Sequence, residues 1–486
     1  MVRSFPPLSE VAAVVPGAEL RGAGAVVPTD VAADTRAMAP GALFFCVAGE
    51  RADGHAFADA ALAAGASALV VERWLEPTAP QVRVPSVRAA MGPMSAAVFG
   101  RPAEAMATVG VTGTNGKTTV TYLLESIFLA AGVATGLIGT VGARIAGTPV
   151  ELPHTTPEAP ELQRLLSRMR DAGVKALAME VSSHALTHRR VDGITFDVAA
   201  FTNLSQDHLD FHLTMEDYAD AKARLFTSAL ARRGVINVDD PAGARIAASA
   251  PIPVITCGIE RDADVRATDV TSGRDGIACS IGGERIASPL LGAFNAQNVL
   301  VAVAAARELG ISPEAVADGV RTLGSVPGRM ERVDVGQGFL LVVDYAHTPD
   351  SIRSVLRAAR PLSTGRVIVV FGCGGDRDRA KRPLMGEAAT ANADLAIVTS
   401  DNPRSEEPGS IVAEILPGAQ RGGGTYVVEL DRRAAIERAV AEARDGDVVV
   451  VAGKGHEPGQ TFGDRTLPFD DRAVARAALL DAGGAR

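Results

Sequence analysis

The chain has 486 residues with 48 basic and 57 acidic side chains, so its formal net charge is −9. With 47% hydrophobic and 22% charged residues, its composition is that of a folded globular protein and excludes disorder, collagen and coiled coil. The mildly acidic balance, without basic runs, argues against a nucleic-acid-binding protein. At about 150 residues per domain, the length predicts about three domains.

Cysteine usage and hydropathy indicate the compartment. The four cysteines lie far apart and form no C-x-x-C pair, which favours a reduced cytoplasmic protein over a disulfide-bonded or zinc-binding one. The N-terminus lacks an apolar run of signal-peptide length, and no stretch approaches the ~18 apolar residues that a membrane span needs. We therefore expect a cytoplasmic protein without a membrane span.

The basic residues are divided very unevenly between the two side-chain types. Forty-three are arginine and only five are lysine, a bias typical of genome composition rather than of a fold. Where arginine has replaced nearly every lysine, we expect the remaining lysines to mark places where a compact or reactive amine is needed. Lys117 and Lys222 fall in segments discussed below, Lys381 follows the polar loop 371–378 and Lys454 lies in the polar loop 452–457. Only Lys175 has no candidate role, and we expect it at the surface. The five are Lys117, Lys175, Lys222, Lys381 and Lys454.

The first predicted domain covers residues 1–100. It alternates buried strands with a helix, namely a strand at 43–47, a helix at 57–65 and a strand at 68–72. The Gly- and Pro-containing segment 99–102 is the predicted linker to the next domain.

The second predicted domain covers residues 101–325 and the third covers 326–486. Strands separated by helical stretches predict parallel sheets and an α/β fold in both. The predicted strands are 107–111, 174–181 and 234–238 in the second domain, and 340–343, 366–371, 395–399 and 447–451 in the third.

A Gly-rich loop follows the first strand of the second domain. Residues 109–119 end in Gly-Lys-Thr as a Walker A loop does, although Val111 stands where the strict pattern has glycine. In such a loop, backbone N–H groups cradle phosphates, Lys117 contacts the β- and γ-phosphates, and the Thr118 hydroxyl binds Mg²⁺. The alternative is a Gly-rich turn with an incidental Lys-Thr pair, but the strand–loop–helix context favours nucleotide binding.

An acidic side chain closes the predicted strand 174–181. Glu180 follows an apolar run, and an acidic residue at the end of a neighbouring strand is the usual Mg²⁺ partner in phosphate-loop sites. An exposed carboxylate at a strand end fits the composition equally well, so the residues alone leave both readings open.

The segment 202–212 is rich in acidic and imidazole groups, and a helix is predicted after it at 215–226. Lys222 falls in the middle of the apolar stripe of that helix. It is either a lysine whose amine reaches solvent from the edge of a core face or an amine held in a site. His208 and His212 have a metal-like spacing, but without an H-E-x-x-H pattern zinc is disfavoured.

Three predicted strands of the third domain run into polar loops at 371–378, 400–404 and 452–457. Ligands of open α/β sheets bind outside the carboxyl ends of the strands. The Arg, Asp, Asn and Glu side chains of these loops suit a zwitterionic ligand, since Arg binds carboxylates and the acids bind amines. Each loop by itself is equally well explained as a solvated turn.

Several long motifs carry a family resemblance that spans essentially the whole chain. They are Gly-Thr-Asn-Gly-Lys-Thr-Thr at 113–119, Glu-Val-Ser-Ser-His-Ala-Leu at 180–186, Asn-Leu-Ser-Gln-Asp-His-Leu-Asp-Phe-His at 203–212, Asp-Tyr-Ala-His-Thr-Pro at 344–349 and Asp-Asn-Pro-Arg at 401–404, together with Asp-Thr-Arg at 34–36 and Asp-Gly-His at 53–55. In these motifs the chain resembles the Mur ligases.

The resemblance implies three domains: a central P-loop ATPase-type parallel sheet, an N-terminal UDP-binding α/β domain and a C-terminal Rossmann-like α/β domain. It implies a cytoplasmic, monomeric, ATP-dependent ligase of peptidoglycan precursor synthesis. The D-Glu carboxylate of UDP-N-acetylmuramoyl-L-alanyl-D-glutamate is phosphorylated to an acyl phosphate, and an amine of meso-2,6-diaminopimelate then displaces the phosphate.

The resemblance also implies roles for individual residues. Catalysis falls to Lys117, Lys222 and His208. ATP contacts fall to Gly113, Thr114, Asn115, Gly116, Lys117, Thr118, Thr119, Asn298, Arg329 and Asp344. Mg²⁺ contacts fall to Thr118, Glu180, His208 and Lys222, the last as an N-carboxylated lysine. The UDP-linked substrate is assigned to Thr35, Thr155, Thr156, Ser182 and Arg190. The amino acid is assigned to Arg377, Asp401, Asn402, Pro403, Arg404, Gly453 and Glu457.

Three alternatives remain beside this interpretation. The same ligase adding L-lysine is disfavoured because Arg404 is expected to bind the distal carboxylate that lysine lacks, and an unpaired buried guanidinium would cost about 1–3 kcal/mol. A folylpolyglutamate synthase-like ligase is disfavoured by the N-terminal domain and the Asp-Asn-Pro-Arg loop. A P-loop regulatory switch would hydrolyse nucleotide without regard to amino acids.

Overall fold

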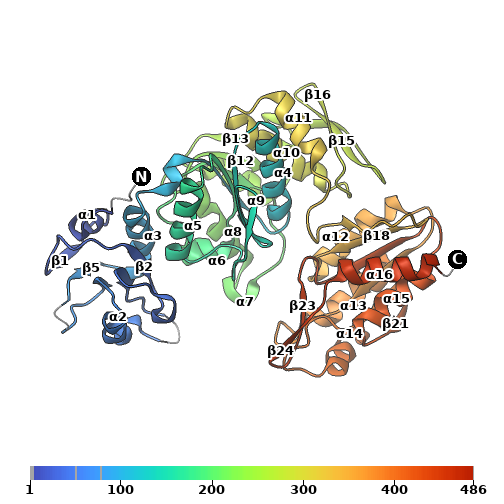
Figure 1. The fold of residues 1–486 in the computed structure, drawn as a ribbon. Helices are drawn as coiled ribbons and strands as arrows, with labels where there is room; N and C mark the ends of the chain where they lie inside the picture. The colour runs from blue at the N-terminus through green and yellow to red at the C-terminus, as the bar shows by residue number, and fades with distance from the viewer. Residues whose placement is uncertain (1–4, 50–51, 77–78, 485–486) are drawn as a thin grey trace. The chain divides into compact units, whose positions relative to one another are not determined.

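The computed structural model describes residues 5–49, 52–76 and 79–484, which form two compact units (Figure 1). Unit 1 comprises Met1–Leu204, Thr214–Arg266 and Leu300–Gly319. Unit 2 comprises Ser205–Leu213, Ala267–Val299 and Val320–Arg486. The sheets of both units are mainly parallel and are packed against helices, so the predicted α/β class is confirmed.

Unit 1 begins with a five-stranded sheet in the order β1-β5-β4-β3-β2. Its strands are β1 (Glu19–Arg21), β2 (Asp30–Ala32), β3 (Ala42–Phe45), β4 (Ala68–Val71) and β5 (Gln81–Arg83), and its helices are α1 (Leu8–Ala13), α2 (Ala58–Ala63) and α3 (Val87–Val98). Alternate residues of β3 and β4 face α1 and α3 on one side and α2 on the other, which gives two small cores. The strands and the helix predicted in this region are confirmed.

The second sheet of unit 1 carries the phosphate loop. Its strands lie in the order β13-β12-β11-β6-β10-β7-β8-β9, parallel from β13 to β7 and antiparallel beyond. They are β6 (Ala107–Thr112), β7 (Thr135–Gly139), β8 (Gly142–Ile145), β9 (Thr148–Val150), β10 (Ala176–Glu180), β11 (Phe196–Phe201), β12 (Ala231–Asn237) and β13 (Val254–Gly258). The helices that follow the strands are α4 (Lys117–Ala130), α5 (Ala159–Asp171), α6 (Ser183–Thr187), α8 (Met215–Ala223) and α9 (Pro241–Ser249).

A run of antiparallel strands follows β13 in the chain, and the predicted α/β alternation did not include it. These strands are β14 (Val265–Gly273), β15 (Gly276–Ile281) and β16 (Glu284–Ser288). Two helices, α10 (Asn295–Glu308) and α11 (Pro313–Thr322), lead to the last sheet.

The C-terminal sheet has the order β17-β18-β22-β19-β20-β21, and only β17 is antiparallel to its neighbour. Alternate residues of the buried strands face α12, α13 and α14 on one side and α15 and α16 on the other (Figure 1). The strands predicted at 340–343, 366–371, 395–399 and 447–451 are confirmed within one residue at each end. The strands are β17 (Glu331–Arg332), β18 (Leu340–Asp344), β19 (Val367–Phe371), β20 (Leu395–Val398), β21 (Thr425–Val428) and β22 (Val448–Ala452), and the helices are α12 (Pro349–Ala359), α13 (Lys381–Asn392), α14 (Pro408–Gly422), α15 (Arg432–Glu442) and α16 (Asp471–Gly484).

A buried ion pair ties together the carboxyl ends of two strands of this sheet. The guanidinium of Arg432 donates to both carboxylate oxygens of Asp471, at 2.8 and 2.6 Å, and both side chains are fully buried. The same guanidinium donates to the backbone oxygens of Ser400 and Ala452, which lie where β20 and β22 lead into their loops. Arg432 therefore fixes the spacing of the two loops.

We expect Arg432→Met to lower the free energy of unfolding by about 3–5 kcal/mol, because it leaves the Asp471 carboxylate buried without its cation. Urea denaturation followed by circular dichroism measures the loss. The double variant Arg432→Met/Asp471→Leu should lose clearly less, since it removes the unpaired charge. An equal loss in the single and double variants would contradict this account of the ion pair.

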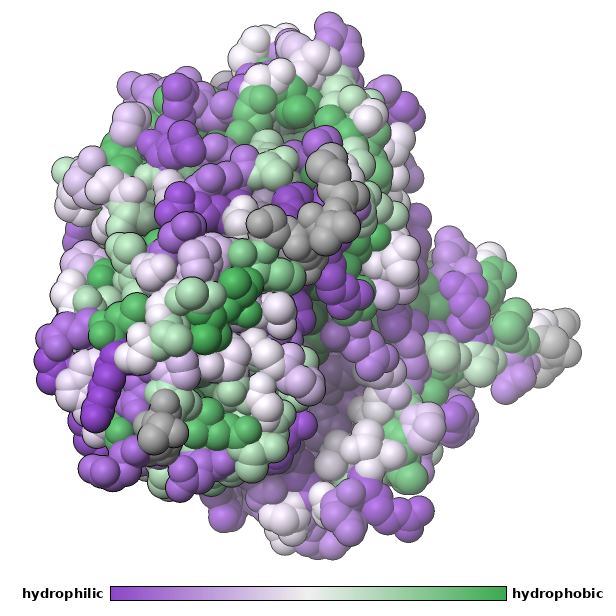
Figure 2. Space-filling model, turned by 60° about the vertical axis from the view of Figure 1, so that its left-hand side comes forward, coloured by the Kyte–Doolittle hydropathy of each residue, from purple (hydrophilic) through white to green (hydrophobic). Residues whose placement is uncertain are grey.

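The surface view in Figure 2 shows hydrophobic residues in small groups separated by hydrophilic ones. Large apolar side chains are instead gathered in the cores between sheets and helices. Among the described residues, no helix combines the length and the hydropathy that crossing a membrane requires.

Candidate functional site

The phosphate loop connects β6 to α4. Gly116 precedes the helix with φ +86°, a left-handed conformation that favours glycine, and α4 begins at Lys117. The Lys117 ammonium folds back over the loop and donates to the backbone oxygens of Gly113 (2.9 Å) and Thr114 (2.8 Å). The strand–loop–helix geometry that the sequence predicted is therefore present, and the N-terminus of α4 is a ready anion site.

The loop is held from the side by the two residues that follow β11. The amide N–H of Thr114 donates to the Asn203 backbone oxygen (2.8 Å), and the amide N–H of Asn115 donates to Asn203 Oδ1 (2.9 Å). Thr202 Oγ1 donates to the Asn115 oxygen at 2.6 Å. At Gly113 a Cβ would lie 1.9 Å from Thr202 Oγ1, so only glycine fits. Sequence reasoning missed both supports, although they stand directly after a strand in a segment singled out for other residues.

Lys222 is buried on α8, with 1% of its surface exposed. Its amine donates to the Gly113 backbone oxygen at 2.8 Å and lies 4.2 Å from the centre of the Tyr218 ring. The Tyr218 hydroxyl in turn lies 3.2 Å from Thr114 Oγ1. The amine therefore does not reach out to solvent. It shares one carbonyl of the phosphate loop with Lys117, which places two ammonium groups at the loop.

Glu180 ends β10 and is 1% exposed, so it is not a solvated carboxylate at a strand end. Because β10 pairs with β6 in register, Glu180 lies beside Val111 at the start of the phosphate loop. Its carboxylate accepts from the Thr140 backbone N–H (2.9 Å) and hydroxyl (3.1 Å). The Thr140 hydroxyl also lies 3.1 Å from the Thr155 hydroxyl, which joins a predicted metal ligand to a predicted substrate contact.

The predicted substrate contacts of the central sheet come together in one network. Thr156 Oγ1 donates to the Glu180 backbone oxygen (2.9 Å) and accepts from the Ser182 N–H (3.2 Å). The Arg190 guanidinium donates to the Thr156 oxygen (3.1 Å) and to Glu158 (2.8 Å). Glu158, which also accepts from an arginine of α3, was not predicted, because these partners come from distant parts of the chain.

The predicted contacts of the N-terminal sheet are arranged around short turns. Thr35 begins a single helical turn, in which Asp34 accepts from the Arg36 backbone N–H. His55 is buried and bridges Asp53 to the Glu72 backbone N–H, which donates to His55 Nε2 at 2.9 Å. His55 therefore fixes the local backbone.

His208 belongs to unit 2, whereas Thr118, Glu180 and Lys222 belong to unit 1. It has φ +54° at the N-cap of α7 (Leu209–His212), and its Nε2 lies 3.4 Å from an Asp207 oxygen. Within the described residues, no group of three or more His, Cys, Asp or Glu side chains is placed to hold a metal ion. The ligands predicted for Mg²⁺ do not form such a cluster, because two of them are a threonine hydroxyl and a lysine.

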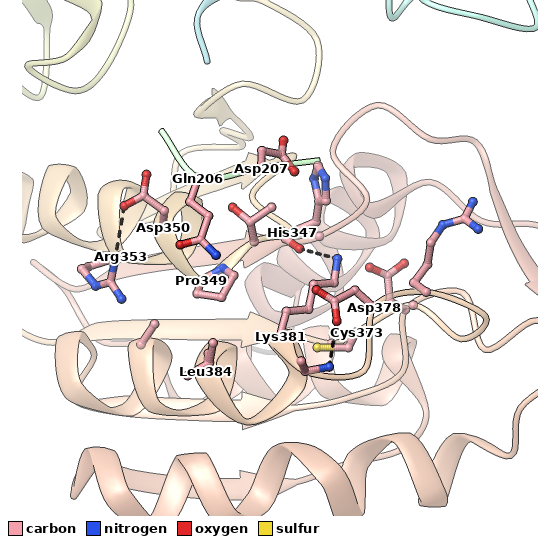
Figure 3. A pocket seen from close by; sticks show the side chains of 18 of the residues that line it. Gln206, Asp207, His347, Pro349, Asp350, Arg353, Cys373, Asp378, Lys381 and Leu384 are labelled. Atoms are coloured by element: carbon pink, nitrogen blue, oxygen red, sulfur yellow. Dashed lines mark hydrogen bonds and ion pairs between the residues drawn. The ribbon is translucent and has the colours of Figure 1, made fainter. Parts of the chain in front are cut away.

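Six of the seven predicted amino-acid contacts of unit 2, all but Pro403, line one cavity of about 800 Å³. Figure 3 shows it from close by, with Leu384 of α13 on one side and Gln206 and Asp207 on another. Pro403 is buried beside Gly375, where a Cβ would lie 1.8 Å from the Pro403 oxygen. The predicted contacts on the cavity wall are Arg377, Asp401, Asn402, Arg404, Gly453 and Glu457.

Backbone hydrogen bonds hold Arg404 in place at the cavity. It has φ +53°, its N–H donates to the Thr461 oxygen (3.0 Å), and its oxygen accepts from the Gly463 N–H (2.6 Å). Its guanidinium donates to the Gly375 oxygen at 2.7 Å. Arg377, by contrast, is exposed, and its guanidinium donates to the neighbouring Asp376 backbone oxygen at 3.1 Å.

The residues predicted to contact nucleotide in unit 2 are also ordered by local bonds. Asn298 donates to Asn295 Oδ1 on α10 (2.7 Å), and the Arg329 guanidinium lies 4.8 Å from the centre of the Tyr345 ring. The Asp344 carboxylate accepts from the N–H groups of Met330 (2.7 Å) and Ala346 (2.8 Å). Burial raises the pKa of Asp344, although the positive charge of Arg329 opposes that rise.

Burial also shifts the pKa values of three side chains at the cavity. It raises the pKa of the Tyr345 hydroxyl to about 12 and that of the Cys373 thiol to about 12. Burial and the nearby Lys381 ammonium lower the pKa of His347, whose backbone oxygen accepts from Lys381 Nζ at 3.0 Å (Figure 3). At neutral pH these three side chains are therefore uncharged, and the cavity's charge comes from its Asp, Glu, Lys and Arg groups.

Three family models match the chain. Residues 29–98 match the model described as Mur ligase family, catalytic domain, and residues 111–306 match the Mur ligase middle domain. Residues 328–455 match the Mur ligase, glutamate ligase domain.

Full-length relatives carry one activity in their names. The UDP-N-acetylmuramoyl-L-alanyl-D-glutamate–2,6-diaminopimelate ligase of Geobacillus thermodenitrificans is 47% identical over 460 residues, covering 92% of this chain and 94% of the relative. The ligase of the same name from Streptomyces coelicolor is 47% identical and covers 98% of this chain and 97% of its own.

Solved structures give the same fold. A 2,6-diaminopimelate ligase structure has a TM-score of 0.73 at 34% identity and covers 99% of this chain and 100% of its own. MurF from Acinetobacter baumannii has a TM-score of 0.66 at 18% identity, and the match covers 99% of this chain and 100% of MurF. FolC from E. coli has a TM-score of 0.59 at 21% identity, and the match covers 82% of this chain and 93% of FolC. The last two show the fold alone. The predicted three-domain α/β fold is confirmed.

Proposed function

Because the chain belongs to the Mur ligase family, we propose that it joins meso-2,6-diaminopimelate to UDP-N-acetylmuramoyl-L-alanyl-D-glutamate, releasing ADP and phosphate from ATP, in peptidoglycan precursor synthesis. The observation that carries this proposal is the cavity of unit 2, whose wall holds Arg404 beside Asp401 and Glu457. A guanidinium and two carboxylates suit a ligand with both carboxylate and ammonium groups. The name shared by relatives about 47% identical to the chain agrees with that ligand.

The chemistry begins at the phosphate loop. A carboxylate is a poor electrophile, so the D-Glu carboxylate must first take the γ-phosphoryl group of ATP and become an acyl phosphate. The loop N–H groups and Lys117 stabilise the charge on the transferring phosphoryl group. Lys117 now bonds to two loop carbonyls, and on nucleotide binding it exchanges them for phosphate oxygens. The amine of the amino acid then attacks the acyl carbon, and phosphate leaves.

The oxygen donors beside the loop fit Mg²⁺, which prefers oxygen ligands and keeps several waters. The buried Glu180 carboxylate and the Thr118 hydroxyl would hold it, with His208 and an N-carboxylated Lys222 as further ligands. Bound Mg²⁺ neutralises the crowded phosphate charge. The burial of the Lys222 amine at a loop carbonyl supports this role, because a carbamate formed there would place its carboxylate at the phosphate loop.

The other substrates are assigned to the remaining parts of the chain. Thr155, Thr156, Ser182 and Arg190 bind the muramoyl-peptide portion, and Thr35 binds in the UDP domain. Asn298, Arg329 and Asp344 complete the nucleotide site. We place the domain boundaries near residues 100 and 325, and we take the protein to be a cytoplasmic monomer.

ADP release tests the proposal. Release should require both UDP-N-acetylmuramoyl-L-alanyl-D-glutamate and meso-2,6-diaminopimelate, and it should be much slower with L-lysine or ornithine, which lack the distal carboxylate. A coupled ADP assay with this panel gives the answer. Release that ignores the amino acid would instead indicate a nucleotide switch, and equal rates with lysine and diaminopimelate would remove the proposed role of Arg404.

A further inference from the structure

Lys454 is a buried lysine that lies behind the wall of the amino-acid cavity, next to its lining residue Gly453, and the proposed function assigns it no contact with a substrate. It has no exposed surface, and burying an ammonium costs several kcal/mol unless partners offset the cost. It is also one of only five lysines in a chain with 43 arginines. Both observations point to a required ammonium.

The partners of the Lys454 ammonium are side chains of the amino-acid cavity. Its Nζ lies 3.1 Å from Asn402 Oδ1, 3.3 Å from Glu457 Oε2 and 4.0 Å from Asp401 Oδ1. A compact ammonium with three donors can face three such acceptors from one point, whereas the planar fork of arginine cannot.

The bonds around Asn402 determine which group of its amide faces the cavity. Its Oδ1 accepts from Lys454 and also from the Thr461 backbone N–H (3.0 Å), which can only donate. Its Nδ2 donates to Glu457 Oε2 at 2.8 Å. Both acceptor positions of the amide oxygen are thus used inside the protein, and an amide has a second N–H. Asn402 therefore offers the ligand a donor.

We propose that Lys454 is a positioning residue that sets the polarity of this cavity. Its ammonium holds Asn402 with its free N–H toward the amino acid, where it binds the distal carboxylate together with Arg404. It also draws Oε2 of Glu457 inward and so leaves Oε1 to accept from the ligand's ammonium. The proposal rests on the proposed function, since it concerns how the same cavity selects an amino acid with a carboxylate at each end.

Lys454→Met tests the proposal, because methionine is an unbranched side chain only one atom shorter than lysine and removes every donor. We expect the KM for meso-2,6-diaminopimelate to rise about tenfold or more, the effect of leaving buried acceptors unpaired. The KM values for ATP and the UDP-linked substrate should stay within about twofold. The preference for diaminopimelate over L-lysine, as a ratio of kcat/KM, should fall about tenfold. Lys175→Met, at the exposed lysine before β10, is the control and should change none of these values.

Asn402→Asp provides a second variant if Lys454→Met does not fold, since the buried ammonium keeps its partner. The aspartate places an acceptor where the amide N–H stood, so the preference for diaminopimelate should again fall. An unchanged preference in either folded variant overturns the proposal, as does an equal loss with both amino acids, which is the mark of a merely structural lysine. Failure of the wild-type protein to use diaminopimelate would instead refute the proposed function.

Discussion

The variant Lys222→Arg is expected to fold and to lose about a thousandfold in kcat. Arginine keeps a positive charge at the phosphate loop but cannot react with CO₂ to form a carbamate. The Lys222 amine is buried 2.8 Å from the Gly113 oxygen, at the phosphate loop where we propose that the metal and the phosphates bind. Losing that charge from the phosphoryl-transfer step removes several kcal/mol of stabilisation. The ADP-release assay measures kcat, and circular dichroism checks the fold.

A matched control and a second measurement distinguish loss of the carbamate from a packing defect as the cause of the lost activity. Lys175→Arg changes the same residue type at the exposed start of β10 and should leave kcat unaltered. In CO₂-free buffer the wild-type rate should fall and should recover on adding bicarbonate, because carbamate formation is reversible. Near-normal turnover by Lys222→Arg, or a wild-type rate indifferent to bicarbonate, would show that no carbamate is required.

Arg404→Met is the second variant with a large expected effect. It should lower kcat/KM for meso-2,6-diaminopimelate by about a hundredfold, because a charge-assisted bond from the guanidinium to the ligand carboxylate is lost. The Gly375 oxygen already holds the guanidinium at 2.7 Å, so the loss is of a preorganised contact. Turnover with L-lysine, which lacks the distal carboxylate, should change much less.

Steady-state kinetics with the two amino acids gives both values. Arg438→Met serves as the control. Arg438 lies on the exposed face of α15, where it pairs with Glu442 one helical turn further along the same helix, and it does not line the cavity. If Arg404→Met lowered kcat/KM equally for both amino acids, the guanidinium would act on the loop and not on the ligand. Its backbone bonds to Thr461 and Gly463 survive the substitution.

The phosphate loop shows how far local sequence reaches. Its glycines, its lysine and the apolar strand before it predicted the loop, the start of the helix and the role of Lys117, because these depend on residues adjacent in the chain. Its lateral supports, Thr202 and Asn203, were missed because they arrive from β11, a neighbour of β6 that only the strand order brings near.

The two readings of Lys222 show what the pattern of a helix leaves open. Periodicity placed the lysine on the apolar stripe of α8, but it did not show whether the amine points toward solvent or into a site. The packing of α8 against the phosphate loop decides the matter, since Gly113 and Tyr218 surround the amine. Glu180 was settled in the same way, because the register of β10 with β6 buries its carboxylate beside the loop.

The sequence by itself determined the α/β class, the C-terminal strands, the phosphate loop and the short set of lysines, because strand and helix periodicity, turn chemistry and residue choice are local properties. The tertiary structure decided the partners of those lysines. Lys222 meets a carbonyl 109 positions away and Lys454 an amide 52 positions away, while Lys175 lies exposed. Contacts at such separations depend on strand order and helix packing, so composition marked the lysines and only the fold distinguished the buried amines from the exposed one.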